Sequence, residues 1–262
     1  MSLTERYDKA RDAFSKKDVK LSKEIHSKPL ASAETHNVSG TYLKSVVYGG
    51  LDGTLTTFSI VSAVAGAALS PSIILVLGFA NLVGDGFGMA VGDYLTTKAE
   101  MEYQEHERKR EMWELETNSE GEKSEMVEIY EGKGISKKNA TQIVDKMANH
   151  KEAFVDIMMV EELGINQSNE NPIHNAIVTF FSFISFGVIP LLIYLLAQVI
   201  SIKSNLFIFA IILTGITLFV LGAVKTHITK KNWLMSGLET LIIGAIAATV
   251  SYGIGYALHG LA

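Results

Sequence analysis

The chain has 262 residues, of which 48% are hydrophobic, and a formal net charge of -5 at pH 7. Residues 1–44 hold 9 Lys and Arg with 6 Asp and Glu, residues 98–171 hold 10 with 18, and only 4 of 23 basic and 4 of 28 acidic residues lie elsewhere. The remaining sequence therefore has the composition of membrane-spanning helices. The absence of cysteine excludes disulfides and thiolate metal sites, and the acidic excess in residues 98–171 argues against nucleic acid as a ligand.

We predict an all-α membrane protein with five transmembrane helices and a cytoplasmic three-helix insert between helices two and three. Apolar stretches of the length that a bilayer requires, about 20 residues, lie at 46–69, 73–97, 174–200, 205–225 and 234–258. The predicted domains are a polar N-terminal tail (1–43), transmembrane helices 1–2 (44–97), a cytoplasmic domain (98–171) and transmembrane helices 3–5 (172–262). Because Lys and Arg concentrate in the tail and the insert, both should be cytoplasmic, with the C-terminus on the lumenal side.

Three features of the predicted spans bear on their shape. Glycines at 49, 50 and 53 surround Asp52 at the start of the first span and predict weak helix continuity there. Pro190 predicts a kink in span three. Small residues in span five are typical of close helix packing: Gly237, Gly244, Ala248, Ser251 and Gly255.

The insert begins as an extension of the second span. Residues 99–116 are strong helix formers, so we predict one uninterrupted helix leaving the bilayer, ended by residues 118–121. A short helix near 122–132 should follow. Ser136 has the character of an N-cap for a third helix, which we expect to run to about Leu163.

Four acidic residues lie in the predicted spans, which have no Lys or Arg well inside them: Asp52, Asp85, Asp93 and Glu239. A charge at the bilayer centre costs about 2.5 to 3.5 kcal/mol on insertion scales, so such residues are candidates for function. We interpret Asp52, and the pair of Asp85 and Met89, as ligands for a dehydrated divalent cation or a proton. The Met89 thioether suits a borderline transition metal better than Mg²⁺ or Ca²⁺. Solvation at the membrane interface explains Asp93 and Glu239 equally well.

Each predicted insert helix carries carboxylates, and one adds methionines: Glu107, Glu111 and Glu114; Glu122, Glu125 and Glu128; Met158, Met159, Glu161 and Glu162. Like charges three and four residues apart share a helix face at a cost of a few tenths of a kcal/mol per pair. The spacing alone leaves two interpretations open: the helices enclose several metal ions, or they form a charged bundle with partial ion pairing, as between Glu105 and Lys109. A Glu-x-x-His pattern and enzyme motifs are absent, so we expect neither a di-iron site nor an enzyme.

The segments Tyr48–Gly53, Ala80–Met89 and Gly92–Tyr94 resemble the vacuolar iron transporter family, as do insert segments around Lys109–Glu114, Glu122–Glu125 and Asp156–Gly164. In that family five spans form a homodimer, the ion path lies between the subunits, and Fe²⁺ leaves the cytosol in exchange for protons. The resemblance implies that Asp52 and Met89 lie on the pathway. It also implies a set of insert ligands: Glu111, Glu114, Glu122, Glu125, Met158, Met159 and Glu162. The N-terminal tail is longer than the resemblance accounts for.

We therefore expect an integral membrane protein of a vacuole or other endomembrane that moves Fe²⁺ out of the cytosol, with protons as counter-ions and a second copy as partner. Fe²⁺ is cargo, and no resident cofactor is expected. Two alternatives are a Mn²⁺ exporter of the same architecture and a membrane-anchored metal-buffering or sensing protein. The intramembrane Asp52 argues against a mere anchor, which has no use for a carboxylate at that depth.

Overall fold

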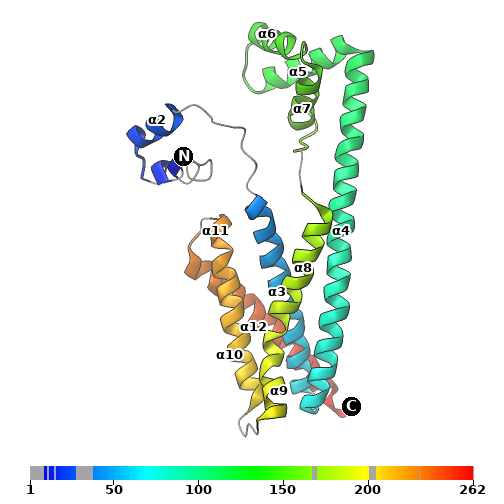
Figure 1. Ribbon diagram of the computed structural model, residues 1–262, viewed down its shortest axis with the longest axis vertical. Helices are drawn as coiled ribbons and strands as arrows, with labels where there is room; N and C mark the ends of the chain where they lie inside the picture. Colours follow the sequence, from blue (N-terminus) through cyan, green and yellow to red (C-terminus); the bar gives the residue numbers. More distant parts are fainter. Residues whose placement is uncertain are drawn as a thin grey trace. The chain divides into compact units, whose positions relative to one another are not determined.

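The computed structural model describes residues 9–10, 12–14, 16–27, 38–166, 170–200, 205–229 and 231–261, and every regular element in these ranges is a helix (Figure 1). This confirms the all-α class for the described part of the chain. The predicted tail, residues 1–43, lies largely outside the described ranges, and its described part contains α2 (Val19–Ser27). The chain divides into two compact units.

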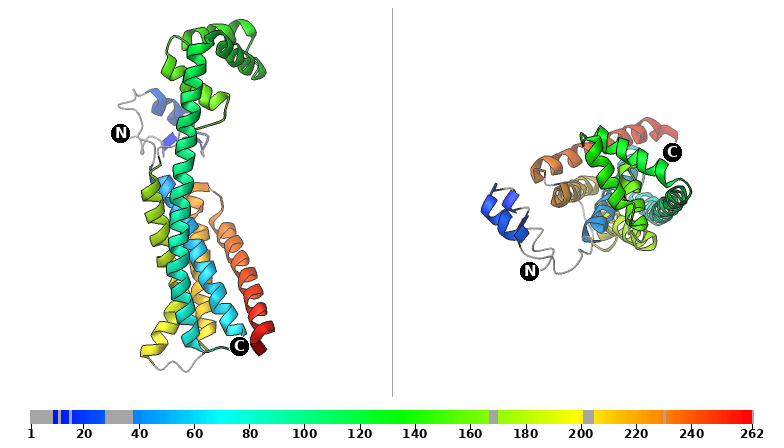
Figure 2. Two further views of the ribbon diagram at one scale, coloured as in Figure 1. Left: turned by 90° about the vertical axis from the view of Figure 1, so that its right-hand side faces the viewer. Right: turned by 90° about the horizontal axis from the view of Figure 1, so that it is seen from above.

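The first unit comprises residues 1–79 and 182–262. Its long helices are α3 (Val38–Gly66), α10 (Leu206–Val224) and α12 (Trp233–Leu258), with the shorter α9 (Ile189–Val199), α11 (Thr226–Thr229) and η1 (His259–Leu261). The helix α3 packs against α12, α10 and α9, and α10 packs against α12 (Figure 1, Figure 2). The helices α3 and α10 therefore form the centre of this unit, since each packs against the other and against α9 and α12.

Glycines allow these helices to approach closely. A Cβ at Gly66 of α3 would overlap the backbone of Tyr252 on α12, and one at Gly255 of α12 would overlap the backbone of Ala63. A Cβ at Gly244 would meet Leu218 on α10. The predicted close packing of span five is thus confirmed at these glycines, because no larger residue fits at this separation.

The prediction of weak helix continuity around Asp52 is wrong. The helix α3 runs without interruption through residues 49–53. The glycines serve packing instead, because a Cβ at Gly50 would meet the ring of Phe186 and one at Gly53 would meet the backbone of Phe183. Thr54, which is buried, donates a hydrogen bond from Oγ1 to the Gly50 carbonyl at 2.7 Å, so its hydroxyl is satisfied within the helix.

The second unit comprises residues 80–181. It contains most of α4 (Pro71–Thr117), then α5 (Ser119–Gly132), α6 (Lys137–Met147), α7 (Lys151–Glu161) and the first part of α8 (Pro172–Gly187). The uninterrupted helix predicted from the second span into the insert is confirmed by α4, which has 47 residues. One hydrophobic core joins the end of α4 to α5, α6 and α7: Leu115, Met126, Val127, Ala140, Val144, Phe154, Val155, Met158 and Met159.

The third insert helix, predicted from Ser136 to about Leu163, is in fact two helices. The chain leaves helical geometry at residues 148–150, where Asn149 donates from Nδ2 to the Asp145 carbonyl at 3.0 Å and His150 takes the N-cap position of α7. Asparagine and histidine are poor helix formers, and the Asn149 amide offers the backbone an alternative partner. The break lets α6 and α7 fold back on one another and on α5 around the core.

Three of the described helices are long and apolar enough to cross a membrane, namely α4, α10 and α12. The helices α8 and α9 meet the criterion together but are bent by 49° between Gly187 and Ile189, which confirms the kink predicted at Pro190. Described helices thus supply three or four spans by length and composition. The helix α3 falls short because Asp52 and its many Gly, Ser and Thr residues reduce its hydropathy, so the predicted count of five spans remains a prediction.

Candidate metal centre

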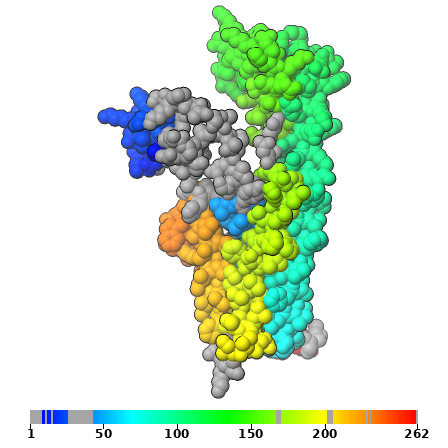
Figure 3. Space-filling model, in the orientation of Figure 1, coloured from blue at the N-terminus to red at the C-terminus, as the bar shows by residue number. Residues whose placement is uncertain are grey.

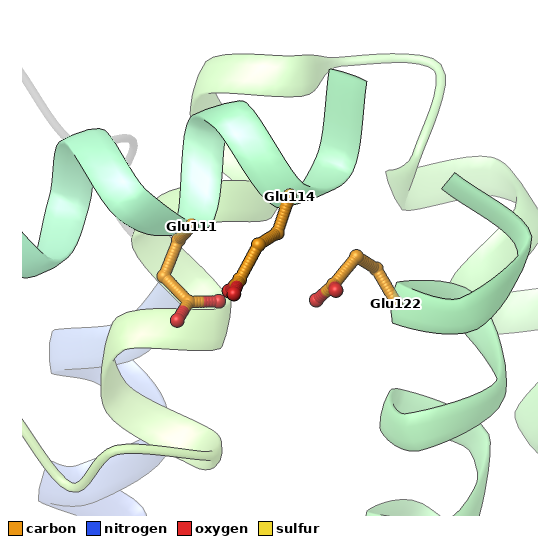
Figure 4. Close-up of side chains that lie close together, drawn as sticks. All are labelled: Glu111, Glu114 and Glu122. Atoms are coloured by element: carbon orange, nitrogen blue, oxygen red, sulfur yellow. The ribbon is translucent and has the colours of Figure 1, made fainter. Parts of the chain in front are cut away.

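Carboxylates from α4, α5 and α7 gather at the edge of the core of the second unit. Glu111 and Glu114 on α4 point toward Glu122 on α5, with one oxygen of each within 4.8 Å of the others (Figure 4). Glu122 also belongs to a second group with Glu125 and Glu162, in which the same limit holds. The two groups share Glu122 and together bring five carboxylates into one cluster.

Helical periodicity explains why these side chains converge. Glu111 lies four residues before the core residue Leu115, Glu122 lies four before Met126, and Glu162 lies four after Met158. Residues four apart share a helix face. Packing of the apolar residues at the centre therefore carries one carboxylate from each of three helices to the rim of the core.

The turn between α4 and α5 fixes the position of Glu122. The Asn118 side chain caps α5 by accepting a hydrogen bond from the Gly121 backbone, with Oδ1 to N at 3.3 Å. A Cβ at Gly121 would overlap the Asn118 side chain, so glycine is needed for this cap. The cap starts α5 one residue after Asn118, which places Glu122 in its first turn.

Ion pairs hold α7 against α4 beside the cluster. Arg108 of α4 donates from Nε to Asp156 of α7 at 3.0 Å and from Nη2 to Glu152 of α7. Lys133, next to α5, pairs with Glu161 at the end of α7. These contacts set the register in which Glu162 reaches the other carboxylates.

Solvation within the cluster is uneven, because Glu111 and Glu122 are buried, Glu114 and Glu162 are half-buried and Glu125 is exposed. The side chain of Glu111 is 0% exposed and that of Glu114 is 31% exposed. Oε2 of Glu111 and Oε2 of Glu162 are buried and accept a hydrogen bond from none of the described residues. Oε1 of Glu111 lies 2.7 Å from Nη2 of Arg110, in a geometry that gives an ion pair and not a hydrogen bond. Buried oxygens without donors are available to a cation.

Burial and mutual repulsion raise the pKa values of the buried carboxyls. Loss of solvation, with the Glu162 carboxylate next in importance, raises the pKa of Glu111 to about 7 despite the opposing effect of Arg110. Loss of solvation and the Glu125 carboxylate raise the pKa of Glu122 to about 7, and the same causes raise the pKa of Glu162. Near neutral pH Glu111 and Glu122 can therefore exchange a proton for a cation.

Arg110 is the counter-ion that the sequence analysis did not identify. Its guanidinium lies 2.9 Å from Glu107, 2.7 Å from Glu111 and 2.7 Å from Glu114. The spacing gave the signal, because Arg110 is three residues after Glu107 and four before Glu114. The ion pair expected between Glu105 and Lys109 is also present, at 2.6 Å. The ion pairing of the second interpretation is thus present beside a partly buried carboxylate cluster. The binding of metal ions by this cluster stays a prediction.

The two predicted methionine ligands, Met158 and Met159, closely precede Glu161 and Glu162 in the sequence. In the structure both methionine side chains lie inside the hydrophobic core. Met158 and Met159 are both 0% exposed, and apolar side chains surround them. Both methionines therefore stabilise the hydrophobic core of the second unit. Their role as metal ligands stays a prediction.

The predicted intramembrane residues lie in different units. Asp52 is half-buried on α3 of the first unit, whereas Asp85 is exposed and Met89 half-buried on α4 of the second unit. Asp85 and Met89 are four residues apart and so share a face of α4. Their role as cation ligands stays a prediction.

Asp93 and Glu239 both have partners. Asp93 accepts a hydrogen bond from Thr179 of α8, with Oδ2 to Oγ1 at 2.6 Å. Glu239 lies 3.5 Å from Lys225 and its side chain is 64% exposed. Although no Lys or Arg lies well inside the predicted spans, Lys225 at the end of α10 thus reaches Glu239 of α12.

A chain of apolar helices that can cross a membrane, carrying a buried carboxylate cluster outside its apolar stretches, has the features of a metal-ion transporter. Comparison with known proteins identifies the family. The profile of the VIT family matches residues 43–256, and the chain belongs to this family.

Several relatives are similar over nearly their whole length. The chain is 38% identical to the "Vacuolar iron transporter" of Toxoplasma gondii over 96% of this chain and 88% of that protein, and 34% identical to that of Plasmodium falciparum over 95% of both. It is 30% identical to "Vacuolar iron transporter 1" of Arabidopsis thaliana over 84% of this chain and 87% of that protein. These relatives are named as transporters and not as enzymes.

The matches differ at the tail. The profile of the VIT family begins at residue 43, so the tail lies outside it. The alignment with the Toxoplasma gondii protein covers 96% of the chain and therefore includes most of residues 1–43.

Proposed function

We propose that this protein transports Fe²⁺ out of the cytosol into a vacuole or an equivalent compartment, in exchange for protons. The observation that carries the proposal is the carboxylate cluster around Glu111, Glu122 and Glu162, in a chain whose helices can cross a membrane. Oxygens of Glu111 and Glu162 in this cluster accept a hydrogen bond from none of the described residues. The names of its full-length relatives indicate iron as the cargo.

The first step of the proposed mechanism is capture. The two carboxylate groups that share Glu122 bind Fe²⁺ from the cytosol, and Arg110 releases Glu111 and Glu114 as the cation replaces it. Carboxylates are hard ligands that also bind Mg²⁺ and Ca²⁺. A softer thioether ligand from Met158 or Met159 would favour a borderline metal such as Fe²⁺ over these ions. Protons held by Glu111 and Glu122 leave as the metal enters, because their pKa values of about 7 lie near cytosolic pH.

The second step is passage through the membrane. Ions move along the acidic side of α4 to Met89 and Asp85, and then to Asp52 of α3. Protonation of Asp52 from the acidic compartment releases the metal, which couples transport to a proton gradient. In this proposal α3 also crosses the membrane, which brings the number of spans to five. The tail and residues 98–171 are cytoplasmic, and the C-terminus is lumenal. The Lys and Arg distribution supports this orientation.

The functional unit that we propose is a homodimer, with α4 at its interface. Gly84, Gly88 and Gly92 are spaced four residues apart on α4, and a Cβ at any of them would meet no described atom within 4 Å. The apolar side chain of Leu95, on the same face of this stretch, is 55% exposed. A repeated small-residue face of this kind permits a second helix to approach closely.

Flux into proteoliposomes tests the transport proposal. With Fe²⁺ outside and an acidic lumen, we expect iron entry together with a rise in lumenal pH. Asp52→Asn should abolish both, because the side chain can no longer exchange a proton or carry charge. The matched control is Glu239→Gln, which also removes an acidic side chain from a helix that can cross a membrane. Because Glu239 is exposed, this variant should retain flux. Normal flux in the Asp52→Asn protein would refute the pathway assignment.

The same assay separates the alternatives. If Mn²⁺ competes with Fe²⁺ at equal concentration and enters faster, the protein is a Mn²⁺ exporter. If metal binds without entering sealed vesicles and lumenal pH stays constant, the buffering function is correct. The carboxylate-rich cluster accepts either ion, so only the competition experiment distinguishes the two cargoes.

A further inference from the structure

Two adjoining cavities lie between α4 and α8 in the second unit, and neither contributes to the metal centre. The first has a volume of about 390 Å³ and an apolar lining that includes Phe87, Val91, Tyr94, Ile177 and Phe181. The second has a volume of about 570 Å³ and a mixed lining, in which Met101, Pro172 and Ile173 lie among several polar side chains: Tyr94, Lys98, Glu102, Gln104, Glu105, Arg108 and Asn171. Both volumes fall in the range typical of small-molecule sites.

The cavities form one continuous groove. Tyr94 lines both of them. On α4 the lining positions 87, 91, 94, 98 and 102 recur at intervals of three and four residues, so they follow one face of the helix. On α8 the order is reversed, with Phe181 and Ile177 at the apolar cavity and Ile173 at the polar one. We call this continuous surface the α4–α8 groove.

A hydrogen bond between the helices preforms the groove. Thr179 of α8, which is 1% exposed, donates from Oγ1 to Oδ2 of Asp93 on α4 at 2.6 Å. The surfaces of α4 and α8 lie side by side on the face seen in Figure 3. Thr179 and Asp93 lie at the level of Tyr94, where the lining changes from apolar to polar. The two helices are therefore held together at the middle of the groove.

The polar end of the groove offers one cation and one anion that are only loosely paired. Lys98 lies 3.7 Å from Glu102, and their side chains are 50% and 67% exposed. The other charges nearby are occupied more firmly, because Arg108 binds Glu152 and Asp156, and Glu105 lies 2.6 Å from Lys109. Lys98 can therefore bind a phosphate, and Glu102 can bind an ammonium group.

We propose that the α4–α8 groove binds one zwitterionic phospholipid of the surrounding bilayer. An acyl chain lies over Phe87, Val91, Ile177 and Phe181. Tyr94 marks the boundary between chain and headgroup, the depth at which tyrosine is enriched in membrane proteins. Lys98 binds the phosphate and Glu102 binds a primary amine, which favours an ethanolamine headgroup.

A second protein chain is a poorer occupant of the groove. The small residues suited to a helix–helix contact, Gly84, Gly88 and Gly92, lie elsewhere on α4. At 100° per residue their centre is roughly 100° around the helix from the centre of the groove positions. The groove itself presents aromatic and branched side chains followed by paired opposite charges, which complement an amphipathic molecule with a long apolar chain.

Native mass spectrometry of the full-length protein during graded delipidation tests the proposal, with phosphatidylethanolamine as the probe. The wild type should keep one molecule per chain after the bulk lipid is removed. Ile177→Trp fills the apolar cavity and should lower retention about tenfold, equivalent to about 1.4 kcal/mol of binding free energy. The matched control Ile246→Trp, at a 59% exposed position on α12, should retain the lipid.

A second pair of variants tests the headgroup contact without altering packing. Lys98→Glu should lose phosphatidylethanolamine while still binding diacylglycerol, and the exposed control Lys138→Glu should behave as the wild type. Equal lipid retention by Ile177→Trp and Ile246→Trp would overturn the proposal. So would a change of oligomeric mass in Ile177→Trp at constant lipid content, because a second chain would then be the occupant.

Discussion

Three glutamates at the rim of the hydrophobic core of the second unit form one electrostatically coupled cluster. Glu111, Glu122 and Glu162 come from three helices, and each lies one turn from a core residue. Desolvated carboxylates that repel one another store unfavourable free energy, which a divalent cation relieves. Capture of a metal and stabilisation of this cluster should therefore occur together.

Glu122 should be the most sensitive position, because it belongs to both carboxylate groups. We expect Glu122→Gln to lower Fe²⁺ affinity at least about tenfold, since loss of one charged ligand costs more than 1.4 kcal/mol. The matched control is Glu128→Gln, an exposed position on the same helix. Anaerobic titration followed by calorimetry measures both, and equal affinities would remove Glu122 from the site.

The raised pKa values of Glu111 and Glu122, each about 7, predict a pH dependence. Metal binding requires the deprotonated forms, so affinity should rise with pH, by at least about tenfold per unit below pH 6, and level off above pH 7. Without metal the opposite trend holds for stability. The folded carboxyls keep protons that the unfolded chain, with a pKa near 4.5, releases, so the free energy of unfolding falls as pH rises from 4.5 through 7.

Thermal melts of the full-length protein at several pH values, with and without Mn²⁺ as an air-stable probe, measure both trends. The stabilisation by metal should grow between pH 6 and pH 7.5. A stabilisation that is constant over this range would mean that the two carboxyls bind metal without losing protons, contrary to the proposed exchange.

At the scale of elements, packing of α3 against α12 depends on glycine. A Cβ at Gly255 would overlap the backbone of Ala63, whereas one at Gly253 would meet no described atom within 4 Å. We expect Gly255→Ala to destabilise the protein by about 1 to 3 kcal/mol through overpacking. Gly253→Ala should be neutral or stabilising by up to about 1 kcal/mol, from helix propensity.

Melting in detergent distinguishes these two variants, which differ by two positions on one helix. The control matters because both substitutions add the same methyl group to α12. If both variants melted at the same temperature, the close approach of α12 to Ala63 would be wrong.

Periodicity and composition predicted most elements because they are strong over long helices. The long helix α4, the Pro190 bend and the close packing of span five all followed from sequence. The break at Asn149 and His150 did not follow from the sequence. A poor helix former ends a helix only where the break allows more favourable tertiary packing. The glycines near Asp52 gave a wrong prediction of weak helix continuity for a similar reason. A glycine that is required for close packing cannot be distinguished in the sequence from one that ends a helix.

The members of the carboxylate cluster were predictable from the sequence, but its electrostatics were not. Spacing identified the carboxylates of α4 and α5, and the family resemblance identified Glu162 on α7. The pairing of Arg108 with Glu152 and Asp156 depends on how α7 folds back on α4, which no local pattern encodes. Arg110, in contrast, pairs along α4 at helical spacing that the sequence already contains. Burial, and with it the raised pKa values, likewise required the structure.

At the scale of the whole molecule, the proposed dimer gives the last prediction. Gly88 lies at the centre of the open glycine face of α4, so a leucine there has room in the single chain but would collide with a close partner helix. Gly88→Leu should therefore convert dimer to monomer without lowering the melting temperature of the single chain. Gly253→Leu, at an equally open glycine of α12, should leave the dimer intact. Light scattering of both proteins in detergent gives the mass of the assembly. A Gly88→Leu protein that stayed dimeric would move the interface away from α4, and a wild type that was monomeric in detergent and in crosslinked membranes would require a pathway within one chain.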